Sequence, residues 1–330
     1  MTHKFNRILV AIKDPAALTQ PALAKAAQLA EGSGAELALF HAVPAPLCLG
    51  EGVGTVSTKL DTPNWCTPSA CEAVLAPFVR PLRRRGLLVS TSVRWDHPVD
   101  DAILSEAKRI DADLIVLEAH AGGHHLALVR HLTDWDIVRR SHVPVLLVKS
   151  PTPFHRPNVL VALDPDRAFD KPESLDAEIL EVASAVSEAL QGALHAVHAY
   201  LPVPPSAVTK GSASTDALAE LVQARAKRAA RQLASAVRGV AIPPENQYVV
   251  GRHVPDAIEE VAAQCRSAIT VLGQVNRSGL RRVLIGNTAE RLLDHLGCDI
   301  LVVKAPPSPQ VRRSERMSAQ AVESSVAPAI

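Results

Sequence analysis

The sequence predicts an α/β fold made of two copies of one domain, each a five-stranded parallel sheet with helices on both faces. Phe, Trp and Tyr make up only 3% of the 330 residues, so the cores must be aliphatic, as in Ala- and Leu-rich helices packed on Val- and Ile-rich strands. Strand-type and helix-type segments alternate, which predicts parallel strands joined by right-handed crossovers. The third observation is an internal repeat.

The repeat is an ungapped correspondence between two segments of equal length. Residues 99–149 can be laid on residues 254–304, so that Lys149 falls on Lys304 at a constant offset of 155 positions. Identical short runs recur along it, such as Asp-Ala-Ile near its start and Val-Lys at its end. This offset is close to half the chain, whereas a solenoid repeats every 20 to 50 residues or so. A duplicated domain is therefore predicted.

The first half opens with a strand and a helix. The apolar run at 8–12 predicts a buried strand, and Ala and Leu then recur at helical spacing over 22–30. Gly32 and Gly34 are expected to end this helix. Residues 37–43 predict the second strand.

The rest of the first half continues the alternation. Apolar residues recur over 74–82, and we expect Pro77 and Pro81 to bend this second helix before Gly86 ends it. Three more strands and two more helices follow. The strands are expected at 87–93, 114–117 and 145–148, and the helices at 101–110 and 135–140.

The second half repeats this plan from a strand at 159–163. Its clearest helix signal is a stripe at positions i, i+3, i+4 and i+7, formed by Ile258, Val261, Ala262 and Cys265. Because Cys265 lies on this apolar stripe, we interpret it as a small core residue and not as a nucleophile.

The domain boundaries follow from composition. We expect a first domain at 1–150, a Pro-rich linker at 151–157, a second domain at 158–305 and a disordered tail at 306–330. Residues 44–69, rich in Pro, Gly and Thr, form an insertion that is either a lid or an unstructured loop.

Charge and cysteine content exclude several classes of protein. Lys and Arg total 35 against 34 Asp and Glu, so no generic attraction to nucleic acid or anionic membrane is predicted. The five cysteines include no CxxC pair, which argues against a disulfide framework or zinc ribbon and favours a reducing compartment. No stretch approaches the ~18 apolar residues of a membrane span. We therefore expect a cytoplasmic protein.

A glycine-containing segment follows the fourth strand of the second half. A glycine at a strand's carboxyl end lets a ligand approach the backbone, and the free N–H groups of a following helix can hold phosphate oxygens. A turn bordered by solvated arginines explains the same pattern, and the segment has neither a Walker A nor a GxGxxG spacing. The candidate residues are Gly273, Asn276, Arg277, Ser278, Gly279, Gly286, Asn287 and Thr288.

This segment resembles the ATP-binding signature of the universal stress protein family, which is Gly, two residues, Gly, nine residues, Gly and then Ser or Thr. Here Gly273, Asn276 and Gly286-Asn287 have that spacing. The resemblance extends over roughly residues 5–305 and is closest to tandem members. It implies two Rossmann-like, adenine nucleotide alpha hydrolase-like domains and a role in stress response.

The resemblance also implies roles for individual residues. Asp164, just after the first strand of the second half, would contact the base, and Gly273 and Gly286 would lie beside the phosphates. Asn276 and Asn287 replace a glycine and a hydroxyl residue, which weakens ATP binding in this half.

The first half departs further from the signature. Glu118, Ala121 and His131 fall on Gly273, Asn276 and Gly286. A carboxylate at Glu118 would repel a triphosphate, so we expect no ATP site in the first half. This half could instead bind a different ligand.

Histidines are the remaining candidates for chemistry. Four of them, His120, His124, His125 and His131, lie near one loop, but chance satisfies such spacing easily, so we assign no metal site. His195 and His198 are three positions apart on an expected strand and should face opposite ways. His41 and His198 occupy equivalent strand positions.

The leading hypothesis is a non-enzymatic stress-response protein with no catalytic residues and an ATP or other adenine nucleotide site in the second half only. The family implies an intramolecular pseudo-dimer paired through 145–148 and 300–303; further homodimerisation stays open. Two alternatives remain. One is a slow ATP hydrolase or nucleotidyl-transfer enzyme that uses Asp164 and the arginines of the glycine-containing segment. The other is a scaffold that holds a metal or non-nucleotide ligand in the first half, beneath the insertion at 44–69.

Overall fold

The structure is a computed structural model of the chain. It describes residues 3–43, 68–95, 98–119, 127–166, 174–202, 215–274, 291–292 and 294–304. The expected tail and most of the expected 44–69 insertion lie outside these residues, and Pro68 and Ser69 belong to a helix.

The described elements follow the predicted alternation of strands and helices. The strands are β1 (Arg7–Ala11), β2 (Glu36–Val43), β3 (Val89–Trp95), β4 (Leu114–Glu118), β5 (Val145–Val148), β6 (Asn158–Leu163), β7 (Ala193–Ala199), β8 (Gln247–Val250), β9 (Ile269–Gln274) and β10 (Asp299–Lys304). The helices are α1 (Pro21–Ser33), α2 (Pro68–Arg84), α3 (Val99–Arg109), α4 (Ala127–Arg140), α5 (Leu175–Ala189), α7 (Thr215–Ala236) and α8 (Val254–Gln264), with a short 3-10 helix, η2 (Pro244–Asn246).

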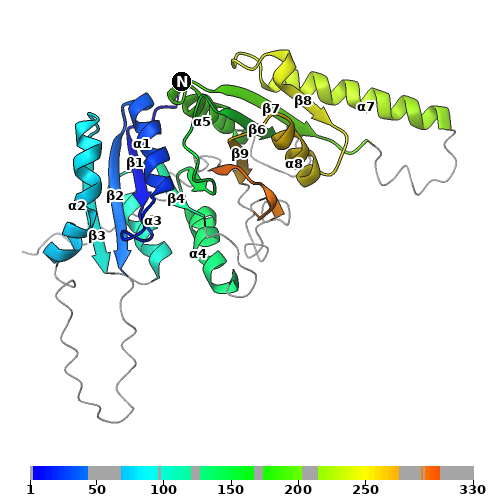
Figure 1. Ribbon diagram of the computed structural model, residues 1–330. Coiled ribbons are helices and arrows are strands. Elements are labelled where there is room, and N and C mark those ends of the chain that lie inside the picture. Colours follow the sequence, from blue (N-terminus) through cyan, green and yellow to red (C-terminus); the bar gives the residue numbers. More distant parts are fainter. Residues whose placement is uncertain are drawn as a thin grey trace, which may run out of the picture.

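The ten described strands form one continuous sheet, in the order β3-β2-β1-β4-β5-β10-β9-β6-β7-β8. Within each half the five strands are parallel, as predicted. The halves meet where β5 and β10 pair antiparallel, with Leu301 opposite Leu146. The predicted pairing of the last strands is confirmed, and it fuses the two five-stranded sheets into one. β3 and β8 form the two outer edges (Figure 1).

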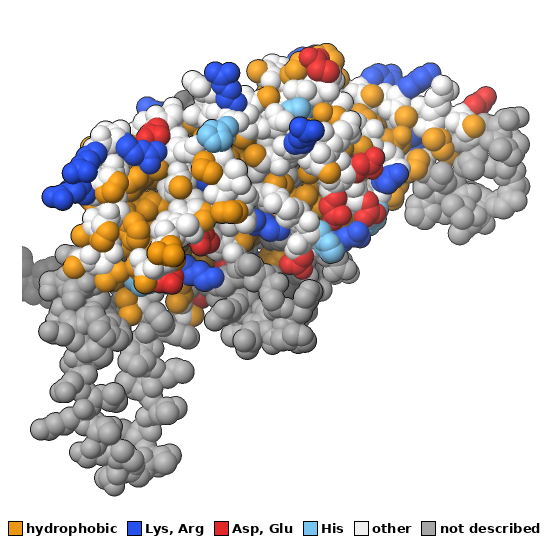
Figure 2. Space-filling view, viewed as in Figure 1, with side chains coloured by type: hydrophobic (Ala, Val, Ile, Leu, Met, Phe, Trp, Pro, Cys, Tyr) orange, Lys and Arg blue, Asp and Glu red, His pale blue; other side chains and the backbone are white. Residues whose placement is uncertain are grey.

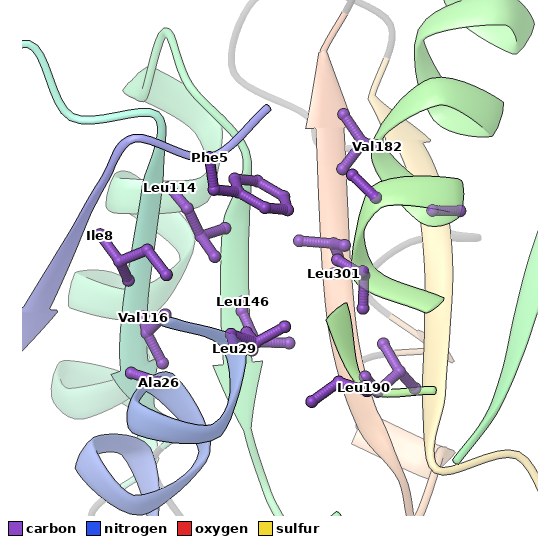
Figure 3. Close-up of a cluster of buried hydrophobic side chains, with 14 of the residues drawn as sticks. Phe5, Ile8, Ala26, Leu29, Leu114, Val116, Leu146, Val182, Leu190 and Leu301 are labelled. Atoms are coloured by element: carbon purple, nitrogen blue, oxygen red, sulfur yellow. The ribbon is translucent and has the colours of Figure 1, made fainter. Parts of the chain in front are cut away.

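Helices cover both faces of the sheet, as the near-continuous apolar runs of the strands require. One face packs against α1, α2, α5 and α7, and the other against α3, α4 and α8. The first core is continuous across the junction of the halves, where Leu146 and Leu301 lie close to Leu29 of α1 and Val182 of α5 (Figure 3). Cys265 lies in the second core and is only 8% exposed, as predicted.

The end of α1 corrects one expectation. Gly34 does end the helix, with φ of 75° and its N–H bonded to the Ala30 carbonyl. Gly32, however, lies inside the last turn, where a Cβ atom would stand 1.8 Å from the Ala189 carbonyl oxygen of α5. Glycine is needed there because α1 and α5 approach each other closely across the junction, not because the helix stops.

Buried polar contacts tie the halves together. The Lys25 ammonium of α1 contacts the Asp299 carboxylate at 2.5 Å, and both side chains are almost fully buried. The other Asp299 oxygen accepts the Lys149 and Ser150 backbone N–H groups at 2.9 and 3.0 Å. Segment 151–157 is docked as well, since Phe154 exchanges two backbone hydrogen bonds of 2.9 Å with the Gln28 side chain.

Two equivalent lysines cross the junction in opposite directions. Lys149, which follows β5, donates to the Leu296 carbonyl of the second half. Its counterpart Lys304, at the end of β10, donates to the Arg139 carbonyl at 2.6 Å and to the Ser141 carbonyl. Ser141 and Leu296 are themselves separated by the repeat offset of 155 positions, so each half binds a helix end of the other.

Candidate functional site

The carboxyl ends of β6, β7 and β9 form the candidate site. β6 pairs with β7 on one side and with β9 on the other, while its own chain continues into α5. This is the point where strand order reverses, and parallel sheets bind ligands in the crevice at such a point. Leu163 lies opposite His198, and the next residue after β6 is Asp164. β9 ends at Gly273 and Gln274.

Unsatisfied polar atoms concentrate at this edge. Six side-chain atoms in the described part of the chain are buried without a hydrogen-bond partner, and four of them belong to residues of this region: Asp164 Oδ2, His198 Nε2, Gln232 Oε1 and Gln274 Oε1. A buried polar atom without a partner is costly. This concentration makes the edge the candidate site of the described chain.

His198 is oriented by its neighbour on β6. Its Nδ1 lies 3.3 Å from the Leu163 carbonyl oxygen, and because a carbonyl only accepts, we infer that Nδ1 carries the proton of the neutral ring. The buried Nε2 is then an acceptor. It lies 3.9 Å from the Asp166 carboxylate, close enough for an ion pair when the ring is protonated. His41 makes the same contact with the Ile12 carbonyl at 2.8 Å, as expected from its equivalent position.

Helix α7 contributes two side chains that contact Asp166 at this edge. The Gln232 amide donates from Nε2 to Asp166, and the Arg228 guanidinium lies 3.9 Å from the same carboxylate. Sequence reasoning did not include Asp166, His198 or Gln232 in the site. The only signal for Asp166 was its place two residues after Asp164, and nothing in the sequence connects Gln232 to it.

Gly273 lies at the exposed end of β9 and also packs against α5. A Cβ atom there would lie 2.7 Å from Ile179 Cδ1 and 3.0 Å from Leu175 Cδ2. The glycine therefore allows the first turns of α5 to approach the end of β9. Seven other predicted site residues lie outside the described residues: Asn276, Arg277, Ser278, Gly279, Gly286, Asn287 and Thr288.

The matching edge of the first half is different. Asp14 Oδ1 accepts the Ala16 N–H at 2.9 Å, so this carboxylate closes its own turn. Glu118 ends β4 opposite Val148, as Gly273 lies opposite Val303, so the equivalence read from the sequence holds in the sheet.

Metal and thiol chemistry find little support in the described part of the chain. No group of three or more His, Cys, Asp or Glu side chains there is arranged to hold a metal ion; His120, His124, His125 and the side chain of His131 lie outside it. His195 stacks on Tyr248, on the face opposite His198, as predicted. Burial raises the pKa of the Cys265 thiol and of the Cys298 thiol, which disfavours the reactive thiolates.

Among the residues that the structure describes, no helix has the length and apolar character of a bilayer span.

Comparison with known proteins agrees with this geometry. The sequence profile of the universal stress protein family matches residues 4–149 and again residues 156–304. Universal stress protein E of Escherichia coli is 31% identical over 227 residues, which cover 66% of this chain and 69% of that protein. Universal stress protein E of Photorhabdus laumondii is 24% identical over 315 residues, covering 91% of this chain and 95% of that one.

Solved structures share the fold. A functionally unknown protein from Pseudomonas aeruginosa superposes with a TM-score of 0.72 at 24% identity and covers 96% of this chain and 98% of its own. A universal stress protein from Archaeoglobus fulgidus has a TM-score of 0.59 at 14% identity, with coverage of 90% and 96%.

Proposed function

This chain belongs to the universal stress protein family, in the tandem form of universal stress protein E, and on that premise we propose that it is a non-enzymatic, cytoplasmic stress-response protein whose second half binds an adenine nucleotide. The single observation that carries the nucleotide proposal is the concentration of unpartnered acceptors at the ends of β6, β7 and β9. The rest of the proposal follows from family membership.

The unpartnered atoms select for hydrogen-bond donors. Carboxylate and amide oxygens, and the Nε2 of a neutral histidine protonated at Nδ1, all accept. A ligand with several N–H and O–H groups, such as an adenine amino group and ribose hydroxyls, would satisfy them. Asp164 is the residue that the family resemblance assigns to the base, and the phosphates would extend toward 276–288, where the glycine spacing resembles the family signature.

The first half lacks this arrangement, which supports a single nucleotide site. Asp14 is engaged in its own turn, and Glu118 places a carboxylate where the second half has a glycine. A triphosphate there would meet like charge.

The pairing of β5 with β10 supports an intramolecular pseudo-dimer. One chain uses both edges that two separate subunits would otherwise bring together. In this proposal the two halves complete the sheet without a second copy of the chain.

Nucleotide binding is tested by isothermal titration of the full chain with ATP and AMP. Asp164→Asn is expected to weaken binding by about ten-fold or more, because it replaces a charged acceptor with an amide. The matched control is Asp14→Asn at the equivalent turn of the first half, which should bind as the wild type does. No heat at millimolar nucleotide, or equal losses in both variants, would rule the proposed site out.

The same samples also test the absence of enzymatic activity. Phosphate release from ATP by the wild type should not exceed that of Asp164→Asn. Turnover that disappears in the variant would instead establish a slow ATP hydrolase.

A further inference from the structure

A groove lies far from the candidate nucleotide site, between α2 and the outer edge strand β3. Its volume is about 760 Å³, and its lining includes Ala73, Ala76, Arg80, Arg83, Arg84 and Thr91. This volume falls in the range of known ligand pockets. Figure 2 shows Lys and Arg side chains at the end of the molecule that carries α2 and β3.

The three guanidinium groups of this groove have no carboxylate partner in the described part of the chain. Arg85, which directly follows α2, contacts Glu31 at 2.7 Å, and Arg140 contacts Asp100 at 2.9 Å, so a neighbouring carboxylate does pair with an arginine where one is within reach. Like charges one helical turn apart repel each other. The groove therefore offers concentrated positive charge beside an apolar wall, which fits an anionic ligand.

The open edge of β3 adds backbone groups to this charge. β3 pairs only with β2 in the described sheet. The Leu88 carbonyl accepts the Leu37 N–H of β2, so the N–H and C=O groups of alternate residues, beginning at Val89, point away from the sheet. Thr91, which lines the groove, and Val93, two residues further along β3, thus present outward backbone donors and acceptors.

Arg83 limits how far this edge is available. Its guanidinium donates to the outward Val89 carbonyl at 2.9 Å. Capping an edge group in this way prevents a new strand from pairing at Val89. An added strand can pair at Thr91 and beyond, which defines its register.

The spacing of the arginines matches that of an extended chain. Arg80 and Arg84 are four residues apart on α2, a rise of about 6 Å. Alternate side chains of a β-strand lie about 6.6 to 6.8 Å apart on one face. Carboxylates two residues apart in an added strand would therefore face both guanidinium groups.

We propose that the groove between α2 and β3 binds an extended acidic peptide segment, which adds as a strand beside Thr91 and Val93 and directs alternate carboxylates to Arg80 and Arg84. Its backbone supplies the hydrogen bonds that the edge of β3 lacks, and smaller apolar side chains of the same face lie on Ala73 and Ala76. Strand addition with side-chain selectivity is a recurrent mode of peptide recognition.

The test uses the full chain and a fluorescent octapeptide, with binding followed by anisotropy. Its positions 1, 3, 5 and 7, which share one face of a strand, are Glu, Glu, Val and Val, and its other positions are Thr. Arg80→Gln/Arg84→Gln should weaken binding about ten-fold, since two charge-assisted contacts are lost. The matched control, Lys227→Gln/Arg231→Gln, removes the same charge at the same spacing on α7 and should change binding less than about two-fold. All four residues are exposed, so thermal unfolding should be unchanged.

Two further probes separate strand addition from simple anion binding. The same peptide, N-methylated at the alternate residues whose N–H groups would face β3, loses the donors for this pairing and should bind about ten-fold more weakly. Inorganic triphosphate should compete poorly. The proposal is wrong if the octapeptide does not bind, if both double variants lose binding equally, or if triphosphate and the N-methylated peptide bind as tightly as the parent peptide.

Discussion

At the scale of single residues, buried charge distinguishes this molecule. Lys25 and Asp299 form an ion pair that is almost completely removed from water, and the Lys25 ammonium also donates to the Ser150 carbonyl at 2.7 Å. The ammonium lies 4.6 Å from the centre of the Phe154 ring as well. A buried pair of this kind adds little net stability compared with apolar residues, but removing one partner leaves the other charge uncompensated.

Lys25→Met is therefore expected to lower the free energy of unfolding by about 3 to 5 kcal/mol. The measurement is urea denaturation at neutral pH. The control is Arg7→Met, which breaks the more exposed pair with Glu36 and should cost about 1 kcal/mol or less. Similar losses in the two variants would contradict this role of burial.

Lys304 gives a pH-dependent prediction. Burial lowers the pKa of Lys304 from its ordinary value of 10.5 to about 8. Below pH 8 the side chain is charged in both states, and the cost of burying that charge is present in full. Between about pH 8 and 10.5 the folded protein has lost this proton while the unfolded chain retains it, so stability from this residue rises with pH.

The free energy of unfolding of the wild type, relative to Lys304→Met, should thus increase between pH 8 and 10.5 by up to roughly 3 kcal/mol. Chemical denaturation at several pH values measures the difference, in which other titrating groups cancel. The same measurement on Lys227→Met, at an exposed position of α7, is the control. If the stability difference between the wild type and Lys304→Met does not change with pH, the hydrogen bonds from Lys304 to its carbonyl partners offset the cost of burying its charge.

At the scale of elements, the crossing of α1 and α5 joins the two halves. Both helices end near the junction, and Gly32 is the residue that permits their contact. In an exposed helix, replacing glycine with alanine stabilises by about 1 kcal/mol. Here the added methyl group would collide with backbone, which cannot rotate away.

Gly32→Ala is accordingly expected to destabilise the protein by about 2 kcal/mol or more, as overpacking does. Thermal or urea unfolding measures it, with Ser235→Ala on the exposed side of α7 as the neutral control. A stabilising effect of Gly32→Ala would mean that α1 and α5 separate easily.

At the scale of the whole molecule, the continuous sheet and the shared core predict that the halves unfold together. The three tryptophans, at positions 65, 95 and 135, all lie in the first half. Their fluorescence therefore reports on the first half, whereas far-UV circular dichroism reports on the entire chain. The pairing of β5 with β10 and the crossed lysines Lys149 and Lys304 couple the two.

Leu160→Ala, in the fully buried centre of β6, tests this coupling. It should destabilise by about 2 to 5 kcal/mol and shift the fluorescence and circular dichroism transitions by the same amount. An unchanged fluorescence midpoint would show that the first half unfolds independently.

Much of this architecture could be predicted from the sequence. Apolar periodicity located the strands, the 155-residue repeat showed the duplication, and the stripe containing Cys265 identified a core helix. Such patterns work because a strand or helix that is buried needs apolar residues at its own period, whatever its partner is. Asp164 was likewise selected as a candidate by its place after a strand, and its role in binding stays a prediction that rests on the family resemblance.

Only the tertiary structure decided which residues from distant segments contact each other. Asp166 and Gln232 are 66 positions apart, and Lys25 and Asp299 are 274 positions apart; neither pair leaves a periodic trace. The sequence predicts Gly32 to be a helix stop, whereas the structure shows that it is the site of close contact with the Ala189 backbone. The local sequence pattern determines which face of a helix or strand is buried, whereas only the packing of the whole chain determines which residues that face contacts. The unpartnered acceptors and the arginine groove both depend on such long-range contacts.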